Sequence, residues 1–284
     1  MSDPRRPADC LRRLILAAAI LTAGVAPLSA QVGTPAAPQA TVLRMTEAGT
    51  PPASVIYIGN SFFYYNNGIS NLVAQMLTAG APKQALRSTL VGIGGSGLDW
   101  HDVESYFRPN AIGRYSIGSD NIVSFNPPAN PLFDVAVMVD CSQCPVHPDL
   151  KDIFIKYAKR HAETVRQHGA RPVFFMSWAY ADKPEMTDQL AEAYTRAGND
   201  NDALVIPAGL AFSRVVKQHP TIQLYAADKR HPSLAGSYLA AAVIYMTLFD
   251  RDPVGLSYTA GLDPETAGAL QAAARDTVHD YLRH

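Results

Sequence analysis

The 284-residue sequence has few cysteines and no concentrated positive charge. It contains three cysteines and a formal net charge of -1, and no Lys/Arg cluster occurs beyond its first residues. Nucleic-acid-binding domains usually carry a basic patch or stripe, so we do not expect nucleic acid as a partner. The sequence also lacks an internal repeat and a second domain-like segment. Its length and ordinary globular composition therefore favour one large domain.

Residues 1–30 have the pattern of a signal peptide. Arginines precede an apolar run of about twelve residues, 14–25, and a small-residue stretch ending at Ala30 follows it. The run is too short to span a bilayer comfortably, although an N-terminal membrane anchor is the alternative. We expect a secreted or periplasmic protein with no stable membrane insertion after cleavage, and an oxidising compartment.

Cleavage after Ala30 would leave two cysteines, Cys141 and Cys144, in the sequence CSQC. Structural pairing or free thiols is the main interpretation, and a thioredoxin-like redox site is the sharper one. Two prolines follow the motif, Pro145 and Pro148, and they disfavour the helix start that lowers the pKa of a redox thiol. Metal binding is a weaker alternative because no clean four-ligand spacing is present.

Strands and helices alternate along most of the remaining chain. Residues 31–53 are rich in Pro, Ala, Gly and Thr and predict a flexible leader, so we place the domain at residues 54–284. Short apolar runs predict five strands, at residues 55–58, 88–93, 135–139, 172–176 and 204–206. Helical patterns cover residues 69–79, 149–167, 185–197, 209–218, 233–249 and 263–282. This alternation predicts a three-layer α/β/α sandwich with a central, mostly parallel five-stranded sheet.

One segment interrupts the alternation. Residues 107–131 are polar and rich in Asn, Pro and Gly. A loop of this length inside a domain is usually a lid or a binding loop, or else is partly disordered.

The first strand runs into Gly59-Asn60-Ser61, which places a serine at the carboxyl edge of the sheet. A serine hydroxyl is a weak nucleophile unless a base takes its proton. In the sequence ADKRHPS, His231 supplies a base, and Asp228, three residues earlier, supplies an acid that can orient the histidine. Each motif is weak alone, but their order along an α/β chain favours a Ser-His-Asp triad.

The segments GNS, GIGGSGLDWH and DKRHPSLAGSYLAA together resemble the SGNH (GDSL-like) hydrolase superfamily, in particular an exported bacterial branch. The resemblance implies that Ser61 is the nucleophile and that Asp228 and His231 are its acid and base. It implies oxyanion-hole N–H groups at Ser61 and Gly95. It also implies ester hydrolysis without a cofactor or a metal.

Two positions depart from the family pattern. Asn60 stands where an Asp is usual, and we expect little effect because this position is not the acid of the triad. The third block usually supplies an Asn to the oxyanion hole, but this chain has Asp140-Cys141-Ser142-Gln143 there. Gln143 or Ser142 could donate instead, or the donor is missing. Loss of one such donor costs on the order of 10²–10³ in rate.

Three further residues are candidates for substrate binding: Trp100, His101 and Trp178. All follow strand ends, and each has an alternative role in packing or at a helix start. We expect a small-molecule or glycan ester as substrate, with an O-acyl group such as acetyl on a carbohydrate as the first hypothesis. The alternatives are a non-catalytic glycan or small-molecule binding protein with the same fold, and a CxxC thiol-disulfide protein.

Overall fold

The computed structural model describes residues 44–108, 115–117, 119–125 and 131–282. The predicted signal peptide, residues 1–30, lies outside these ranges, as does the leader as far as residue 43. All of the described residues belong to one unit of the chain, Ala40–His284.

The centre of this unit is a five-stranded sheet in the order β2-β1-β5-β6-β7. Every neighbouring pair of strands is parallel. The strands are β1 (Ser54–Gly59), β2 (Arg87–Gly92), β5 (Val135–Met138), β6 (Arg171–Phe175) and β7 (Leu204–Ile206). β1 and β5 are buried along their whole length, as expected for strands covered on both faces. The predicted parallel sheet is confirmed.

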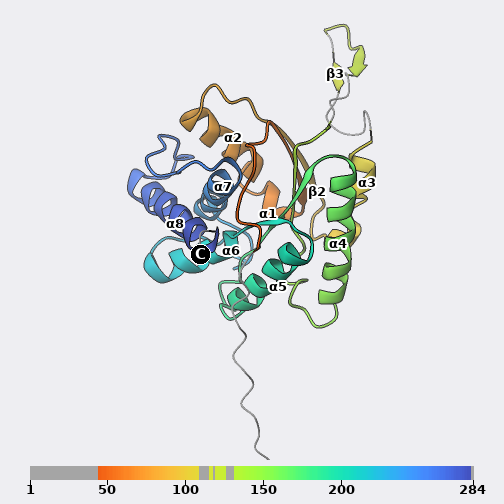
Figure 1. Cartoon of the computed structure of the whole chain (residues 1–284). Helices are drawn as coiled ribbons and strands as arrows, with labels where there is room; N and C mark the ends of the chain where they lie inside the picture. Colours follow the sequence, from red (N-terminus) through yellow and green to blue (C-terminus); the bar gives the residue numbers. More distant parts are fainter. Residues whose placement is uncertain (1–43, 109–114, 118, 126–130, 283–284) are drawn as a thin grey trace, which may run out of the picture. The chain divides into compact units, whose positions relative to one another are not determined.

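Helices on both faces complete the predicted three-layer sandwich (Figure 1). The longer helices are α2 (Ile69–Gly80), α4 (Lys151–Gln167), α5 (Met186–Asp200), α6 (Ala208–Gln218), α7 (Leu234–Phe249) and α8 (Pro264–Leu282). α4 and α5 contact β6, whereas α7 lies on the other face and contacts α2, α6 and α8. α7 is apolar on all sides and is buried from Ala235 to Phe249, so it forms the core of its layer.

The position of β1 in the sheet creates the place for a site. The chain leaves β1 for β2 on one side and later returns on the other side as β5. In open parallel sheets, ligands bind at such a point, outside the carboxyl ends of the strands. The turns after β1, β2 and β5 contain Ser61, Gly95 and Asp140, so these three residues lie at the same edge of the sheet.

The segment expected as a long loop contains two short strands among its described residues. β3 (Tyr115–Ile117) and β4 (Val123–Phe125) pair antiparallel, with Tyr115 opposite Phe125. Asn121, between the strands, has a positive φ of 62°, which suits the turn of a hairpin. Alternation over three residues is too short for a sequence pattern to predict. A role for this segment as a lid stays a prediction.

Residues 44–53, which we name the N-terminal strap, contact the domain although they were predicted to be part of a flexible leader. The N–H of Arg44 donates to the Asn199 side chain over 2.7 Å, and Arg171 donates to the carbonyl of Thr50 over 2.6 Å. The N–H of Ala53 donates to Asp134 over 2.8 Å. Among the described residues, contacts with the domain therefore extend back to Arg44, beyond the predicted start of the domain at residue 54.

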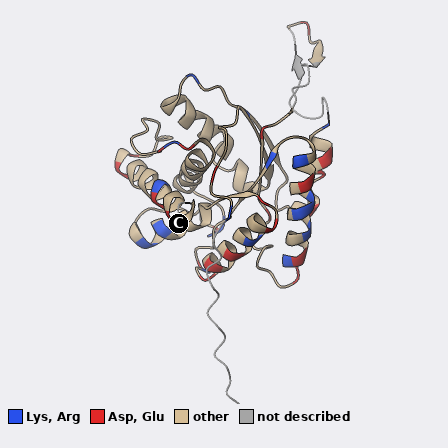
Figure 2. Cartoon of the chain, in the orientation of Figure 1, with Lys and Arg blue, Asp and Glu red and all other residues tan. Residues whose placement is uncertain are grey.

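Charged side chains of both signs lie along α4 and α5 (Figure 2). The opposite side of α4 is buried, through Phe154, Ala158, His161, Ala162 and Val165. This is the amphipathic pattern of a helix with one face on a core. Within the described ranges, no helix has the length and apolar character that crossing a membrane requires.

Candidate active site

Ser61 begins a helix immediately after β1. α1 (Ser61–Tyr64) has Asn60 as its N-cap, and the Asn60 side chain accepts a hydrogen bond from the N–H of Phe62 over 3.1 Å. The strand, the cap and the helix therefore leave the Ser61 side chain at the carboxyl edge of the sheet. Its hydroxyl Oγ lies 2.8 Å from Nε2 of His231, which is 170 residues away in the chain.

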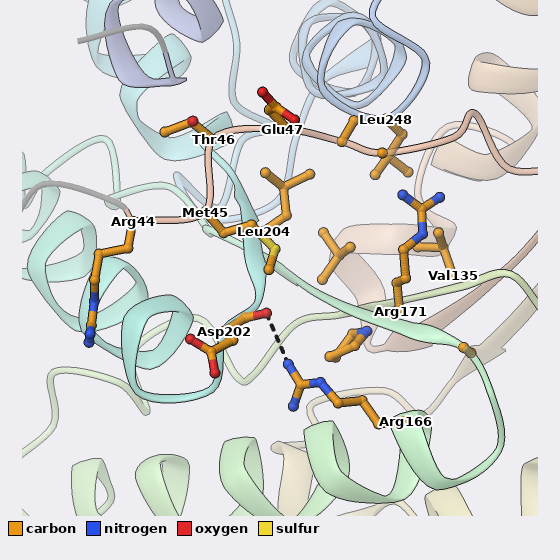
Figure 3. Close-up of a pocket in the computed structure, with 15 residues that line it drawn as sticks. Arg44, Met45, Thr46, Glu47, Val135, Arg166, Arg171, Asp202, Leu204 and Leu248 are labelled. Carbon is orange, nitrogen blue, oxygen red and sulfur yellow. Dashed lines mark hydrogen bonds between the residues drawn. The ribbon is translucent and has the colours of Figure 1, made fainter.

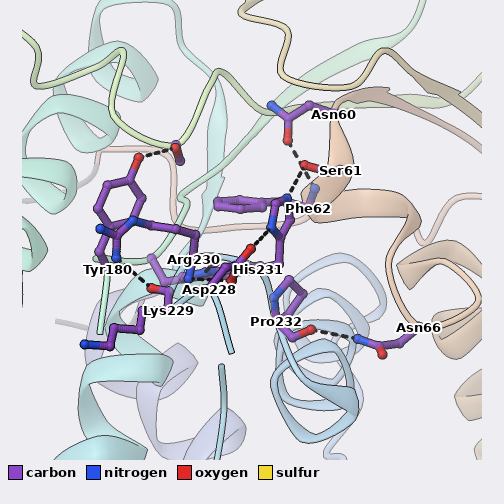
Figure 4. A network of polar contacts seen from close by, with 12 residues as sticks. Asn60, Ser61, Phe62, Asn66, Tyr180, Asp228, Lys229, Arg230, His231 and Pro232 are labelled. Atoms are coloured by element: carbon purple, nitrogen blue, oxygen red, sulfur yellow. Dashed lines mark hydrogen bonds and ion pairs between the residues drawn. The ribbon is translucent and has the colours of Figure 1, made fainter. Parts of the chain in front are cut away.

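Asp228 holds the other side of the histidine (Figure 4). One carboxylate oxygen of Asp228 hydrogen-bonds Nδ1 of His231. The other accepts the N–H groups of Arg230 and His231, over 2.9 Å and 3.0 Å. The hydrogen bond with the His231 ring, followed by the one with Arg230, lowers the pKa of Asp228 to about 2. Asp228 is therefore an anion at neutral pH.

Aromatic rings fix the plane of the imidazole. The ring of Tyr65 stacks on His231 with 4.2 Å between centroids and an interplanar angle of 6°. The ring of Phe62 meets His231 edge-on, at 5.9 Å. The histidine is thus held by contacts on its face and edge as well as by its hydrogen bonds.

The turn after β2 contains Gly95, the predicted second donor. Gly95 has a φ of +74°, and no atom lies within 4 Å of the position that a Cβ would take. The turn is closed by the N–H of Ser96, which donates to the carbonyl of Ile93 over 3.1 Å. The backbone of Gly95 therefore lies beside open space at the edge that carries Ser61.

The turn after β5 is closed by a disulfide between Cys141 and Cys144. Among the alternatives for CSQC, the structure shows the pairing. The sulfur atoms lie near the Asp140 carboxylate in an arrangement that could hold a metal, but both are consumed by the disulfide. α4 begins only at Lys151, so neither cysteine stands at the N-terminus of a helix.

The two candidate third-block donors differ in their surroundings. The Ser142 hydroxyl hydrogen-bonds the Tyr180 hydroxyl over 2.6 Å. The carbonyl of Gln143 accepts the N–H groups of Val146 and His147, over 3.0 Å and 2.8 Å, which makes a turn of the backbone. A role of the Gln143 side chain in an oxyanion hole stays a prediction.

His101, a candidate for substrate binding, is buried instead of facing a substrate. His101 is 3% exposed. Its Nε2 lies 3.0 Å from the Ser96 hydroxyl and 3.1 Å from the Gly59 carbonyl, and its Nδ1 lies 3.1 Å from the Tyr106 hydroxyl. Burial lowers the pKa of His101 to about 4, so the ring is neutral. It ties the glycine turn to the end of β1.

Trp178 is also buried, whereas Trp100 is exposed. The Trp178 ring is packed between Phe62 and Phe212, with centroids 4.4 Å and 4.2 Å away. It is 0% exposed, so it cannot form a sugar platform; its Nε1–H donates to the Arg230 carbonyl over 2.9 Å. Trp100, in the short helix η1 (Leu98–Trp100), is 61% exposed and free to contact a ligand.

Asn60 and Asn66 hold the site together, and sequence reasoning missed both roles. The buried Asn60 amide donates to the carbonyls of Ser96 and Asp140, each over 3.0 Å, so it joins the turns after all three strands. The Asn66 amide donates to the carbonyl of Pro232 over 2.9 Å, next to His231. The sequence signal for Asn66 was the run Asn66-Asn67-Gly68, in which all three residues have positive φ.

A cavity of about 770 Å³ lies elsewhere in the domain (Figure 3). Its walls include the N-terminal strap and the first residues of three strands, Val135, Arg171 and Leu204. These are the amino ends of β5, β6 and β7, whereas Ser61 follows the carboxyl end of β1. The cavity is therefore separate from the Ser61 site.

Comparison with solved structures identifies the fold. A protein assigned to the SGNH hydrolases from Slackia heliotrinireducens is 25% identical, with a TM-score of 0.51, covering 69% of this chain and 98% of that one. A DUF4886 family protein from Bacteroides uniformis is 18% identical, with a TM-score of 0.55, over 79% and 94% of the two chains.

A catalytic mutant of the acetylxylan esterase Axe2 from Geobacillus stearothermophilus is 15% identical, with a TM-score of 0.51, over 70% and 95% of the two chains. No protein-family model matches this chain, and the search of curated proteins found no significant match. The SGNH hydrolase resemblance predicted from the sequence is confirmed by these structures, which share the fold at low sequence identity.

Proposed function

We propose that this SGNH-fold protein is a serine esterase that removes an O-acyl group through Ser61, His231 and Asp228. The observation that carries the proposal is the continuous contact from the Ser61 hydroxyl through the His231 ring to the Asp228 carboxylate. This order of donor and acceptor atoms is what general-base activation of a serine requires. The fold of esterases and SGNH hydrolases supports the same reading.

In the proposed reaction, Nε2 of His231 takes the proton of Ser61 while Oγ attacks the ester carbonyl. The N–H groups of Ser61 and Gly95 hold the negative oxygen of the tetrahedral intermediate. His231 then gives its proton to the leaving alcohol. A water molecule, deprotonated by the same histidine, then attacks the acyl carbonyl; the bond to Ser61 Oγ breaks, the acid leaves, and His231 returns the proton to Ser61. Asp228 stays ionised throughout and stabilises the imidazolium, because its pKa is about 2.

The proposed substrate is an acylated carbohydrate, with acetyl as the first acyl group to test. Two aromatic side chains near the Ser61 edge are exposed, Trp100 by 61% and Tyr64 by 42%. Tyr64 belongs to the same short helix as Ser61, and Trp100 follows the glycine turn. Exposed aromatic faces suit the apolar faces of sugar rings. An acetylxylan esterase among the similar structures supports the choice. Export through the N-terminal segment would place the enzyme among extracellular or periplasmic glycans.

The test is hydrolysis of p-nitrophenyl acetate and of a panel of acetylated xylo-oligosaccharides by the chain without residues 1–30. We expect turnover by the wild type and a loss of at least about 10³ in kcat for Ser61→Ala. Ser257→Ala is the matched control, because Ser257 is exposed and outside the site. Ligand binding without turnover by the folded wild type would instead favour a non-catalytic binding protein.

A further inference from the structure

Arg230 stands between Asp228 and His231 in the sequence. Its side chain contacts Asp182 and Tyr180, which neither side chain of the proposed acid-base pair contacts. Its guanidinium is paired with the Asp182 carboxylate, with N–O distances of 2.5 Å and 3.4 Å. The same group lies over the Tyr180 ring, 3.9 Å from the centroid. A planar guanidinium can stack on a ring and form a forked ion pair at once, which an ammonium group cannot.

Backbone contacts attach the same loop to the same neighbour. The Trp178 indole donates to the Arg230 carbonyl over 2.9 Å, and the N–H of Ala181 donates to the Lys229 carbonyl over 3.1 Å. Lys229 has a positive φ of 64°, an uncommon conformation for a residue with a Cβ. The loop that carries Asp228 and His231 is therefore held to the segment after β6 through both its backbone and the Arg230 side chain.

Tyr180 extends this connection to a third loop. Its ring receives Arg230, and its hydroxyl bonds the Ser142 hydroxyl in the disulfide-closed turn after β5. Figure 4 shows Tyr180 and Arg230 beside the Ser61–His231–Asp228 contacts. The turn after β5 is where the sequence lacks the usual Asn of the family.

We propose that Arg230 is a positioning residue that sets the place of His231 relative to Ser61, acting through Asp182 and Tyr180. The inference rests on the proposed esterase function. The Arg230 side chain contacts Asp182 and Tyr180 rather than Ser61 or the His231 ring, so its effect is on geometry. A displacement of about 1 Å in a catalytic group can cost on the order of 10² in rate, which is felt in kcat more than in KM.

The experiment compares Arg230→Lys, Tyr180→Leu and the double variant with the wild type on p-nitrophenyl acetate. Arg230→Lys keeps the charge but loses the fork and the stacking, and Tyr180→Leu removes the ring. We expect kcat to fall about tenfold in each single variant with KM within about twofold. Because both changes break the shared stacking of Arg230 on Tyr180, the losses should not multiply, and the double variant should lose nearer to tenfold than to a hundredfold.

Arg214→Lys is the matched control. Arg214 is also a partly exposed arginine paired with a carboxylate, that of Asp280, but the pair joins α6 to α8. We expect its kcat to stay at the wild-type value. Unchanged kcat in Arg230→Lys, or additive losses in the double variant, would overturn the positioning role.

A second readout separates this inference from the proposed function. The hydrogen bond between Nδ1 of His231 and Asp228 should give a downfield imidazole proton signal in NMR spectra, which needs no turnover. We expect the signal to broaden or disappear in Arg230→Lys and to persist in Arg214→Lys. A wild type that hydrolyses no ester would defeat the proposed function while this signal still tests the positioning role. A persistent signal in Arg230→Lys would count against that role.

Discussion

Asn60 shows how a single amide can join the turns around a nucleophile. Its NH₂ group faces two carbonyl oxygens, those of Ser96 and Asp140, so the amide orientation follows from its partners. An aspartate there would bring carboxylate oxygens against carbonyl oxygens at a position where Asn60 is only 3% exposed. The sequence predicts little effect on activity from Asn in place of the family's usual Asp. The structure shows that Asn suits this position, because its NH₂ group faces two carbonyl oxygens.

We therefore predict that Asn60→Asp lowers the unfolding free energy by about 1–3 kcal/mol, the cost of an unsatisfied buried polar group. The proposed esterase kcat should fall as well, because the turns after β2 and β5 lose their common donor. Urea denaturation and initial rates measure the two effects. Asn71→Asp is the control: its amide donates to one carbonyl, that of Asn67, at an exposed position. Equal stability of the two variants would contradict the prediction.

Asp140 is a buried carboxylate whose charge opposes folding. Burial is the main cause that raises its pKa to about 6, although the N–H groups of Leu98 and Cys141 donate to it; nearby Asp99 adds to the rise. The folded state therefore favours the protonated form. Its contribution to stability is best below the unfolded pKa of 3.8 and declines as the pH rises to about 6.

Asp140→Asn keeps an acceptor oxygen and removes the charge. We predict that it raises the unfolding free energy at pH 7–8 by on the order of 3 kcal/mol, from the rise of the Asp140 pKa from 3.8 to about 6 at about 1.36 kcal/mol per pKa unit, with little gain at pH 4. Urea melts at both pH values measure the difference. Asp252→Asn is the control, since Asp252 also accepts a backbone N–H but is exposed. A pH-independent difference would show that the charge of Asp140 is not the cause.

At the scale of elements, the turn after β2 depends on one backbone conformation. Gly95 has a positive φ and open space at its Cβ position, so an alanine there meets no clash and only the backbone is strained. We predict that Gly95→Ala costs about 1–2 kcal/mol of stability and lowers the proposed esterase kcat more than tenfold by turning the donor N–H.

The comparison for that variant is Gly268→Ala, in the exposed part of α8. This glycine has ordinary helical φ and no atom near its Cβ position, and alanine there should stabilise the helix by about 0.5–1 kcal/mol. Thermal unfolding and initial rates of both variants measure the contrast. If Gly95→Ala kept the wild-type kcat, the proposal that the Gly95 N–H belongs to the oxyanion hole would be wrong.

Elements buried on both faces were predictable, and elements made by tertiary contacts were not. The buried strands β1, β5 and β7 are almost unbroken apolar runs, and the ends of all five parallel strands agree with the predicted ranges to one residue. α1, η1 and the β3–β4 pair are only three or four residues long, which leaves no periodicity to detect. The sequence order of Ser61, Asp228 and His231 anticipated that they meet. It could not show that Trp178 points into the core.

At the scale of the whole molecule, the carboxyl ends and the amino ends of the strands carry different features. The carboxyl edge carries the Ser61 site, and the amino edge carries the N-terminal strap above the cavity of Figure 3. The strap is attached by Arg44 to Asn199, by Thr50 to Arg171 and by Ala53 to Asp134. Removing it would expose the apolar walls of that cavity, among them Val135, Leu204 and Leu248.

We predict that a chain beginning at residue 54 unfolds several degrees below one beginning at residue 44, with unchanged activity. Each lost hydrogen bond is worth about 0.5–1.5 kcal/mol, and 1 kcal/mol corresponds to about 2–4 °C for a domain of this size. Thermal unfolding and p-nitrophenyl acetate hydrolysis of both chains test the two halves of the prediction. Equal unfolding temperatures would mean that the strap contributes no stability. A large loss of kcat in the folded shorter chain would mean that the amino edge reaches the Ser61 site, against the separation that the sheet imposes.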